Sequence, residues 1–167
     1  QGSLESLEGF RSQFIKSSCN AEYCDWINQS KNEWLLQIGL ASVSHDAITN
    51  KIEQLKTLSN DHKVSLKQEP WEGPLVNQKT PDNALNKNNW LIRIVLPPNQ
   101  IKKILASNEF NSLSNWNWRL TAASGVGDGW PQDSFDNSEN NLAEKVKQLR
   151  ERVSFLGGQL TILNQPE

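Results

Sequence analysis

The stretch Trp90–Pro98 constrains the fold most, because a strand must end within it and a helix must begin. Its first seven residues, Trp-Leu-Ile-Arg-Ile-Val-Leu, are mostly apolar and rich in β-branched side chains, which is typical of a buried strand. Proline donates no hydrogen bond to a ladder, so Pro97 ends the strand, and Pro98 suits the first turn of a helix. Ile101 and Ile104 follow at helical spacing. We therefore predict a strand that leads into a helix almost without a loop.

Further strands and helices are expected on both sides of this stretch. Strands are predicted at residues 34–40, 64–68, 116–122 and 159–163, the first of them central because both of its faces are apolar. Helices with an apolar stripe are predicted after the N-cap Ser44, to residue 58, and over 142–156, where Gly157 supplies the stop. The polar segment 69–88 is predicted to be a loop anchored by Trp71, and 124–131 a glycine-rich turn.

This order predicts an α+β fold, a ferredoxin-like antiparallel sheet with helices packed on one face, plus an N-terminal helical arm. The ferredoxin-like domain spans 33–167 and contains two β-α-β units. The arm spans 4–32, and the segment with Tyr23 and Trp26 is interpreted as a second short helix. Residues 1–3, Gln-Gly-Ser, are interpreted as a tag remnant. Since the sequence has no methionine, we expect an excised domain.

Composition excludes several classes of function. The 167 residues carry a net charge of −2 and no dense lysine and arginine cluster, so nucleic acid is not an expected partner. No apolar run approaches the roughly 20 residues of a membrane span. Cys19 and Cys24 lie too far from the histidines for an expected zinc site, and free thiols in a reducing, cytoplasmic compartment are favoured. Whether the two cysteines form a disulfide stays open.

Arg93 is a candidate substrate-binding residue, because its guanidinium lies in an otherwise apolar strand. Burying an unpaired charge costs free energy, so an arginine in this place is expected to meet an anion, such as a substrate carboxylate held by two hydrogen bonds. The alternative is an arginine at an edge, whose stem covers apolar surface. Both interpretations stay open. Arg119 is a second, weaker candidate, in a strand that already alternates with polar residues.

The glycines of segment 124–131 are candidate cofactor contacts, since glycine lets a backbone approach a phosphate or a ring closely. A dinucleotide fingerprint requires a helix directly afterwards, which is missing here, so a bulge and turn is the favoured interpretation. Trp116 and Trp118, two residues apart, share one face of a strand and are expected in the core. No nucleophile motif is present, so the chain is expected to have no self-contained active site.

Three motifs in sequence order resemble the cap domain of FAD-linked oxidases, most closely the FAD-binding subunit of bacterial glycolate oxidase. The first is the arginine, four residues before a proline, in Arg93–Pro98, at the end of a strand that leads into a helix. The second is the small-residue run Ala122–Gly127. The third is Leu149-Arg150 followed by Gly157-Gly158 and a strand that ends at Pro166. The resemblance covers about residues 34–166.

This resemblance implies a substrate-side lid over the flavin of a separate upstream FAD-binding domain. FAD would take the hydride from a small 2-hydroxy acid, while the cap would orient the substrate and exclude water. Arg93 and Arg119 are then expected to bind the carboxylate, and Ser124, Gly125 and Gly127 to contact FAD. Other oxidase subunits are further partners under this interpretation. The chain alone is expected neither to hold FAD nor to turn over substrate.

Two other functions are kept as alternatives. One is a non-enzymatic ferredoxin-like interaction or regulatory module, because the fold alone does not determine function. The other, less favoured, is a histidine-kinase-type domain that binds ATP and Mg²⁺, on the resemblance of residues 150–162 to the last helix and strand of such domains. Against the kinase interpretation, no asparagine-rich helix is followed by a glycine-rich lid in the required order.

Overall fold

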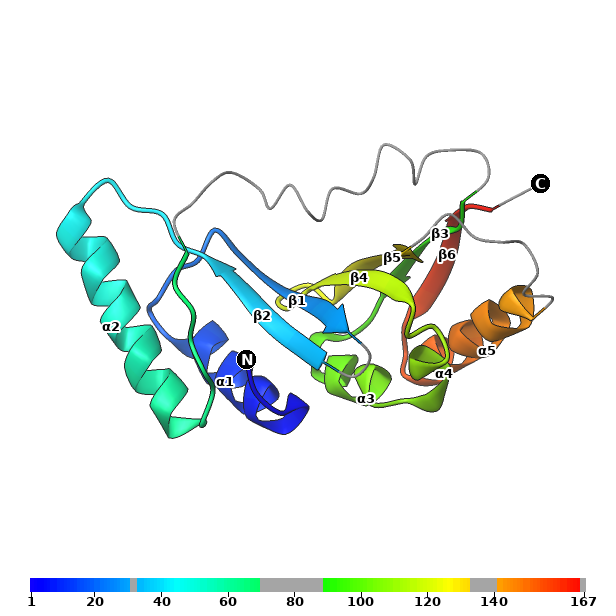
Figure 1. The fold of residues 1–167 in the computed structure, drawn as a ribbon, viewed down its shortest axis with the longest axis horizontal. Helices are drawn as coiled ribbons and strands as arrows, with labels where there is room; N and C mark the ends of the chain where they lie inside the picture. The colour runs from blue at the N-terminus through cyan, green and yellow to red at the C-terminus, as the bar shows by residue number, and fades with distance from the viewer. Residues whose placement is uncertain (31–32, 70–88, 133–140, 166–167) are drawn as a thin grey trace.

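The computed structural model describes residues 1–30, 33–69, 89–132 and 141–165 (Figure 1). The strands are β1 (Tyr23–Ser30), β2 (Glu33–Gly39), β3 (Leu91–Val95), β4 (Trp116–Thr121), β5 (Val126–Pro131) and β6 (Gln159–Asn164). The helices are α1 (Leu4–Lys16), α2 (His45–Asp61), α3 (Ile101–Leu105), α4 (Asn108–Asn111) and α5 (Leu142–Phe155), with the 3₁₀-helix η3 (Pro98–Gln100) before α3. The segments that hold Trp71 and most of the predicted loop 69–88 lie outside the described residues.

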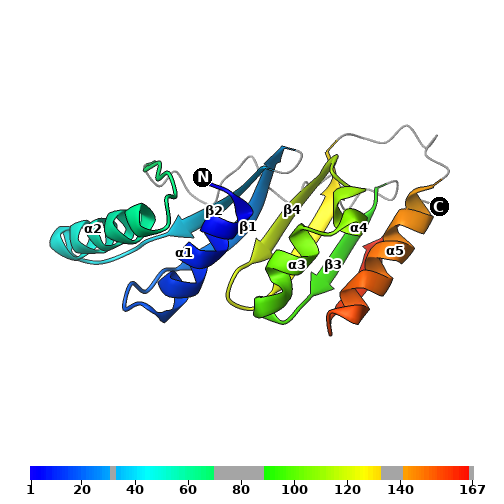
Figure 2. The same ribbon diagram turned by 90° about the horizontal axis from the view of Figure 1, so that it is seen from below.

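The strands form one antiparallel sheet in the order β2-β1-β4-β5-β3-β6. Helices α1, α3, α4 and α5 lie on one face of this sheet, while α2 lies beyond the β2 edge (Figure 2). The predicted α+β class, with helices on one face of an antiparallel sheet and a helical N-terminal segment, is thus confirmed. The core between sheet and helices holds the largest buried side chains, among them Trp26, Trp116 and Trp118.

The stretch around Pro97 and Pro98 folds as predicted. β3 ends at Val95 and lies between β5 and β6, and Pro98 is the first residue of η3, which continues into α3. β4, β6 and α5 also match their predicted positions within a few residues. After α5, Gly157 adopts φ 78°, a left-handed conformation that ends the helix as expected.

Three local predictions are wrong. The second short helix of the arm is instead strand β1, which pairs with both β2 and β4 and is the second strand of the sheet. The strand at 34–40 exists as β2 but is the outer strand, not a central one. Residues 64–68 form no strand; the backbone N–H of Val64 instead caps α2 by donating to Ser59 O at 2.9 Å.

The glycine-rich segment is a fourth difference, because it forms a turn only as far as Gly125 and then strand β5. Gly129 pairs with Trp118, and a Cβ on it would lie 2.5–2.7 Å from the Trp118 ring. A bulky ring on β4 thus occupies the space that a side chain on β5 would need. Glycine has low strand propensity, so this strand depends on its neighbours for its place in the sheet.

The chain consists of two halves built on one plan, although their sequences show no evident repeat. The first half is α1-β1-β2-α2 and the second is α3/α4-β4-β5-α5. The equivalent strands β1 and β4 pair with each other and so join the two halves in one sheet. The ends of α2 and α5 match closely. Lys63 (φ 54°) corresponds to Gly157, and Gly158 N donates to Val153 O at 2.9 Å, as Val64 does to Ser59.

Residues 91–164 have the element order β-α-β-β-α-β, with two helices in the first crossover and the strand order β4-β5-β3-β6. This is the order of elements in the ferredoxin-like plan. The plan predicted for 33–167 is not the one observed, because its first β-α-β unit lacks the strand at 64–68 and β1 belongs to the sheet.

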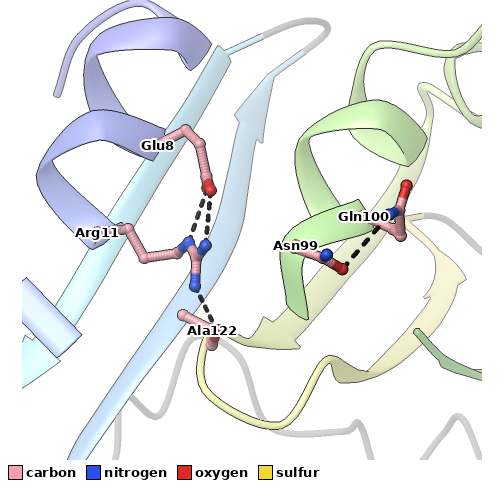
Figure 3. A network of polar contacts seen from close by, with 5 residues as sticks. All are labelled: Glu8, Arg11, Asn99, Gln100 and Ala122. Atoms are coloured by element: carbon pink, nitrogen blue, oxygen red, sulfur yellow. Dashed lines mark hydrogen bonds and ion pairs between the residues drawn. The ribbon is translucent and has the colours of Figure 1, made fainter. Parts of the chain in front are cut away.

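Arg11 joins the two halves through a buried polar contact (Figure 3). Its Nε and Nη2 donate to the Glu8 carboxylate at 2.7 and 2.6 Å, and its Nη1 donates to the Ala122 carbonyl at 3.1 Å. Helix α1 is thereby tied to the turn that connects β4 and β5. A second tie is the ion pair between Glu5 and Lys102, which links α1 to α3.

Candidate functional site

Charged residues gather on the sheet face opposite the helices. Side chains alternate along a strand, so residues directly opposite each other on neighbouring strands share a face. Arg93 pairs with Asp128, and Asp128 pairs with Arg119, so the three form one row across β3, β5 and β4. None of the described helices lies over this face (Figure 1). The row, completed by Asp25 of β1, is the candidate site and is called the ion row below.

Arg93 and Asp128 form the first pair of the ion row. Nε of Arg93 donates to Oδ1 of Asp128 at 2.7 Å and Nη2 donates to Oδ2 at 3.0 Å, a bidentate arrangement. This hydrogen bond and the charge of Asp128 raise the pKa of the Arg93 guanidinium. Because 47% of the Arg93 side chain is exposed, the pair is open to solvent and to a ligand.

Arg119 and Asp25 form the second pair, whose two ends differ in burial. Nε and Nη2 of Arg119 both donate to Oδ2 of Asp25, at 2.8 and 2.6 Å. The Asp25 side chain is only 3% exposed, whereas that of Arg119 is 42% exposed. The buried carboxylate therefore fixes the guanidinium group on its inner side, while the outer side of the guanidinium group is open to solvent.

A hollow of about 240 Å³ opens beside the Arg119–Asp25 pair. Its lining includes Asp25 and Arg119 on one side and Asp128 on the other, with Thr121, Val126 and Trp130 completing the wall. Trp130 packs with Leu91 in a small apolar cluster on the same face. The hollow thus offers one guanidinium group, two carboxylates and an apolar wall, a set suited to a small polar molecule with a carboxylate. The second guanidinium group of the row, that of Arg93, is paired with Asp128 and is not part of the lining.

Three of the five predicted site residues lie apart from the charged groups of the row. Gly125 (φ 71°) sits in the turn between β4 and β5, and a Cβ on it would lie 1.9 Å from the Leu96 carbonyl oxygen. Its neighbour Ser124 is exposed. Gly127 borders the hollow, but its other side faces Leu120, where a Cβ would lie 2.4 Å from Cγ. The close approach that each glycine permits is to protein atoms.

Both arginines of the row are predicted site residues, whereas neither aspartate is. Asp25 lies in a segment interpreted as a helix, and Asp128 in a segment interpreted as a turn, so neither was placed on a sheet face. A weak signal was present, since Tyr23 and Asp25 alternate with the apolar Cys24 and Trp26 as in a strand, although Ile27 breaks this alternation. Asp128, between two glycines, offers no comparable pattern.

The two cysteines lie in the core and are free. Burial first, and then the neighbouring Asp25 charge, raise the pKa of the Cys24 thiol to about 12, while Arg11 acts in the opposite direction. Cys24 is therefore a neutral thiol at physiological pH and a poor nucleophile. The structure thus describes Cys19 and Cys24 as free thiols, a point that the sequence leaves open.

Within the described ranges, no cluster of three or more histidine, cysteine, aspartate or glutamate side chains is arranged to hold a metal ion. In the same part of the chain, no helix is long and apolar enough to cross a membrane. No protein-family model matches the chain. A search of curated proteins also finds no match. The ion row is therefore the feature of the described residues that bears most directly on function.

Proposed function

We propose that this chain is the substrate-capping domain of a FAD-dependent oxidoreductase that acts on small 2-hydroxy acids of the glycolate type. The observation that carries the proposal is the ion row, which places Arg93 and Arg119 on one sheet face with a hollow beside Arg119. These are the two arginines that the resemblance to FAD-linked oxidase caps assigns to the substrate carboxylate. The face would close over the flavin side of a second domain.

The guanidinium groups keep donors for a ligand although each has a partner. Arg93 and Arg119 both use Nε and Nη2 for their aspartates. Among the described residues, neither Nη1 donates to an acceptor, so both can donate to a bound carboxylate. The aspartates meanwhile fix the two arginine side chains in place, so these side chains would lose less conformational entropy when a ligand binds. The cap would in this way orient the substrate.

The aspartates also limit how strongly an anion is attracted. Two arginines and two aspartates give the row no net charge, so binding would depend on directed hydrogen bonds more than on the field of the site. The apolar wall formed by Val126 and Trp130 would exclude water from one side of the ligand. A compact carboxylate fits the hollow of about 240 Å³ better than a nucleotide would.

FAD is assigned to an upstream domain rather than to this chain. The glycines that were candidates for contact with FAD pack against Leu96 and Leu120, so the described residues form no cradle for an isoalloxazine ring. Bound there, FAD would supply the hydride acceptor. The free, buried cysteines support a reducing compartment, and we therefore place the protein in the cytoplasm.

The test is to express the chain together with the polypeptide encoded directly upstream of it. The expected product is yellow and contains FAD in a one-to-one ratio with protein, whereas the chain alone is colourless. A soluble, folded product that takes up no flavin would refute the proposal. A Gly127→Ala variant of the two-part protein, which disturbs the cap only, should retain its FAD.

A non-enzymatic interaction module is the second candidate. The observation in its favour is the zero net charge of the ion row, because alternating charges suit the polar surface of a partner protein. The two candidates differ in what Arg93→Met does. A module would lose affinity for its partner protein, while a cap would keep its FAD domain and lose affinity for the carboxylate.

A further inference from the structure

The two halves of the chain share one plan, and only the second half shows it complete. In the second half, β3 lies beside β5 and is covered on its other side by β6. The first-half strand equivalent to β5 is β2, and none of the described strands pairs with its outer edge. By analogy with the second half, a strand equivalent to β3 belongs beside β2.

Gln1 and Ser65 mark the place of that element. Ser65 N donates to Gln1 O at 2.7 Å, and the N-terminal ammonium group of Gln1 donates to Ser65 O at 2.5 Å. With a peptide N–H in place of the ammonium group, these two contacts are the reciprocal pair of an antiparallel ladder. Lys63 and Gly157 are equivalent and lie 94 positions apart in the sequence. The same shift of 94 positions makes Ser65 equivalent to Gln159 and Gln1 equivalent to Val95. Gln159 and Val95 are paired as well, at one end of the β3–β6 ladder. The contact is thus the first rung of an equivalent ladder.

Helix α2 has an apolar stripe that its own half leaves partly uncovered. By the same shift, Ile48 and Ile52 of α2 correspond to Leu142 and Val146 of α5. In α5 both residues are buried, while in α2 both are only half-buried. Figure 2 shows the reason, since α2 lies beyond the β2 edge whereas α5 lies alongside β3. A strand beside β2 would lie under this stripe.

We propose that the outer edge of β2 and the stripe of α2 form an acceptor site for one β-strand. Its occupant is an extended segment that runs into α1 and ends at Gln1, as β3 runs into η3 and ends at Val95. It lies antiparallel to β2 and turns apolar side chains toward α2 at alternate positions. Only the source of the strand, the connection from the FAD-binding domain, rests on the proposed function; the acceptor site stands on the topology.

The pairing of Gln1 with Ser65 favours this occupant over a second copy of the chain. A segment attached ahead of Gln1 is already held at its last residue, so it loses little freedom when the rest pairs with β2. A second copy would have to lose its translational and rotational freedom to reach the same edge. The pairing uses backbone atoms only, so it does not depend on the identity of the side chain at Gln1.

The experiment adds Leu-Ile-Arg-Ile, the sequence of residues 91–94, directly ahead of Gln1. The matched control adds Leu-Pro-Arg-Pro, which has the same length and charge but cannot form a ladder. Amide hydrogen exchange is measured residue by residue in β2. The strand-forming extension is expected to slow exchange of the β2 amides that point away from β1 by about tenfold or more relative to the control.

Equal exchange in the two extended proteins would overturn the proposal. So would a concentration-dependent dimer of the chain without extension, seen by analytical ultracentrifugation, that protects the same β2 amides, because a second copy would then be the occupant. Neither measurement involves flavin. The acceptor site and the capping function can therefore fail independently of each other.

Discussion

Asp25 on β1 and Arg119 on β4 form an ion pair whose carboxylate is buried and whose guanidinium is open to solvent. Arg119→Met leaves the buried carboxylate without its charged partner, and we expect a loss of roughly 1–3 kcal/mol in the free energy of unfolding. Asp25→Asn combined with Arg119→Met removes the uncompensated charge and should restore part of this loss. Urea denaturation of the single and double variants measures both effects. Additive losses would contradict the pairing.

Arg93 should behave differently, because its pair with Asp128 is half-exposed. For Arg93→Met we expect a stability loss of only about 0–1 kcal/mol, which shrinks further in high salt. Thermal unfolding at low and high ionic strength checks this. A loss comparable to that of Arg119→Met would mean that Arg93 has a structural role, and its variants could then not be used to test substrate binding.

Gly125 should tolerate alanine worse than Gly157 does. Both have a left-handed backbone, which costs a non-glycine residue roughly 1–2 kcal/mol. Only at Gly125 does the added Cβ also meet a backbone atom, the Leu96 carbonyl oxygen at 1.9 Å; at Gly157 the nearest atom is Pro97 Cγ at 3.9 Å. Gly125→Ala is therefore expected to be the more destabilising variant in urea denaturation. Equal losses of stability in the two variants would show that the turn at Gly125 does not pack closely against the Leu96 carbonyl.

The raised pKa of Cys24 predicts a loss of stability at alkaline pH. Its folded-state pKa is about 12 against an ordinary value of 9.0, so the unfolded state releases the thiol proton first. Stability from this group is complete below pH 9 and is lost as the pH rises toward 12. The measurement is the free energy of unfolding from pH 8 to 11 in the wild type and in Cys24→Ala. The wild type should fall more steeply, and parallel curves would contradict the assignment.

Elements with strong local signals were predictable from the sequence. The apolar run before Pro97 defines β3, and the stripe that ends at Gly157 defines α5. β1 was missed because its polar residues are satisfied by distant partners. The side-chain amide of Asn28 donates to Trp116 O at 2.6 Å and accepts from Trp118 N at 2.7 Å, which continues the β1–β4 contact. No local pattern encodes such a partner.

The position of β2 and the existence of β5 were not predictable for a related reason. The order of strands depends on which strand edges pair with each other. The apolar residues of β2 are compatible with a central strand, but equally with an outer strand that α1 covers, which is the observed case. The glycines of β5 carry no strand propensity and fit only because Trp118 fills the space above Gly129. For the candidate site, the sequence therefore indicated the two arginines and the register supplied the aspartates.

The most direct test of the capping function is glycolate oxidation by the two-part protein that carries FAD. Arg93→Met is expected to lower kcat/KM by roughly tenfold to a hundredfold, the effect of losing a charged hydrogen bond, with FAD content unchanged. Arg150→Met, an exposed arginine on α5, is the matched control and should leave kcat/KM unaltered. A wild-type kcat/KM in Arg93→Met at full FAD occupancy would contradict the account.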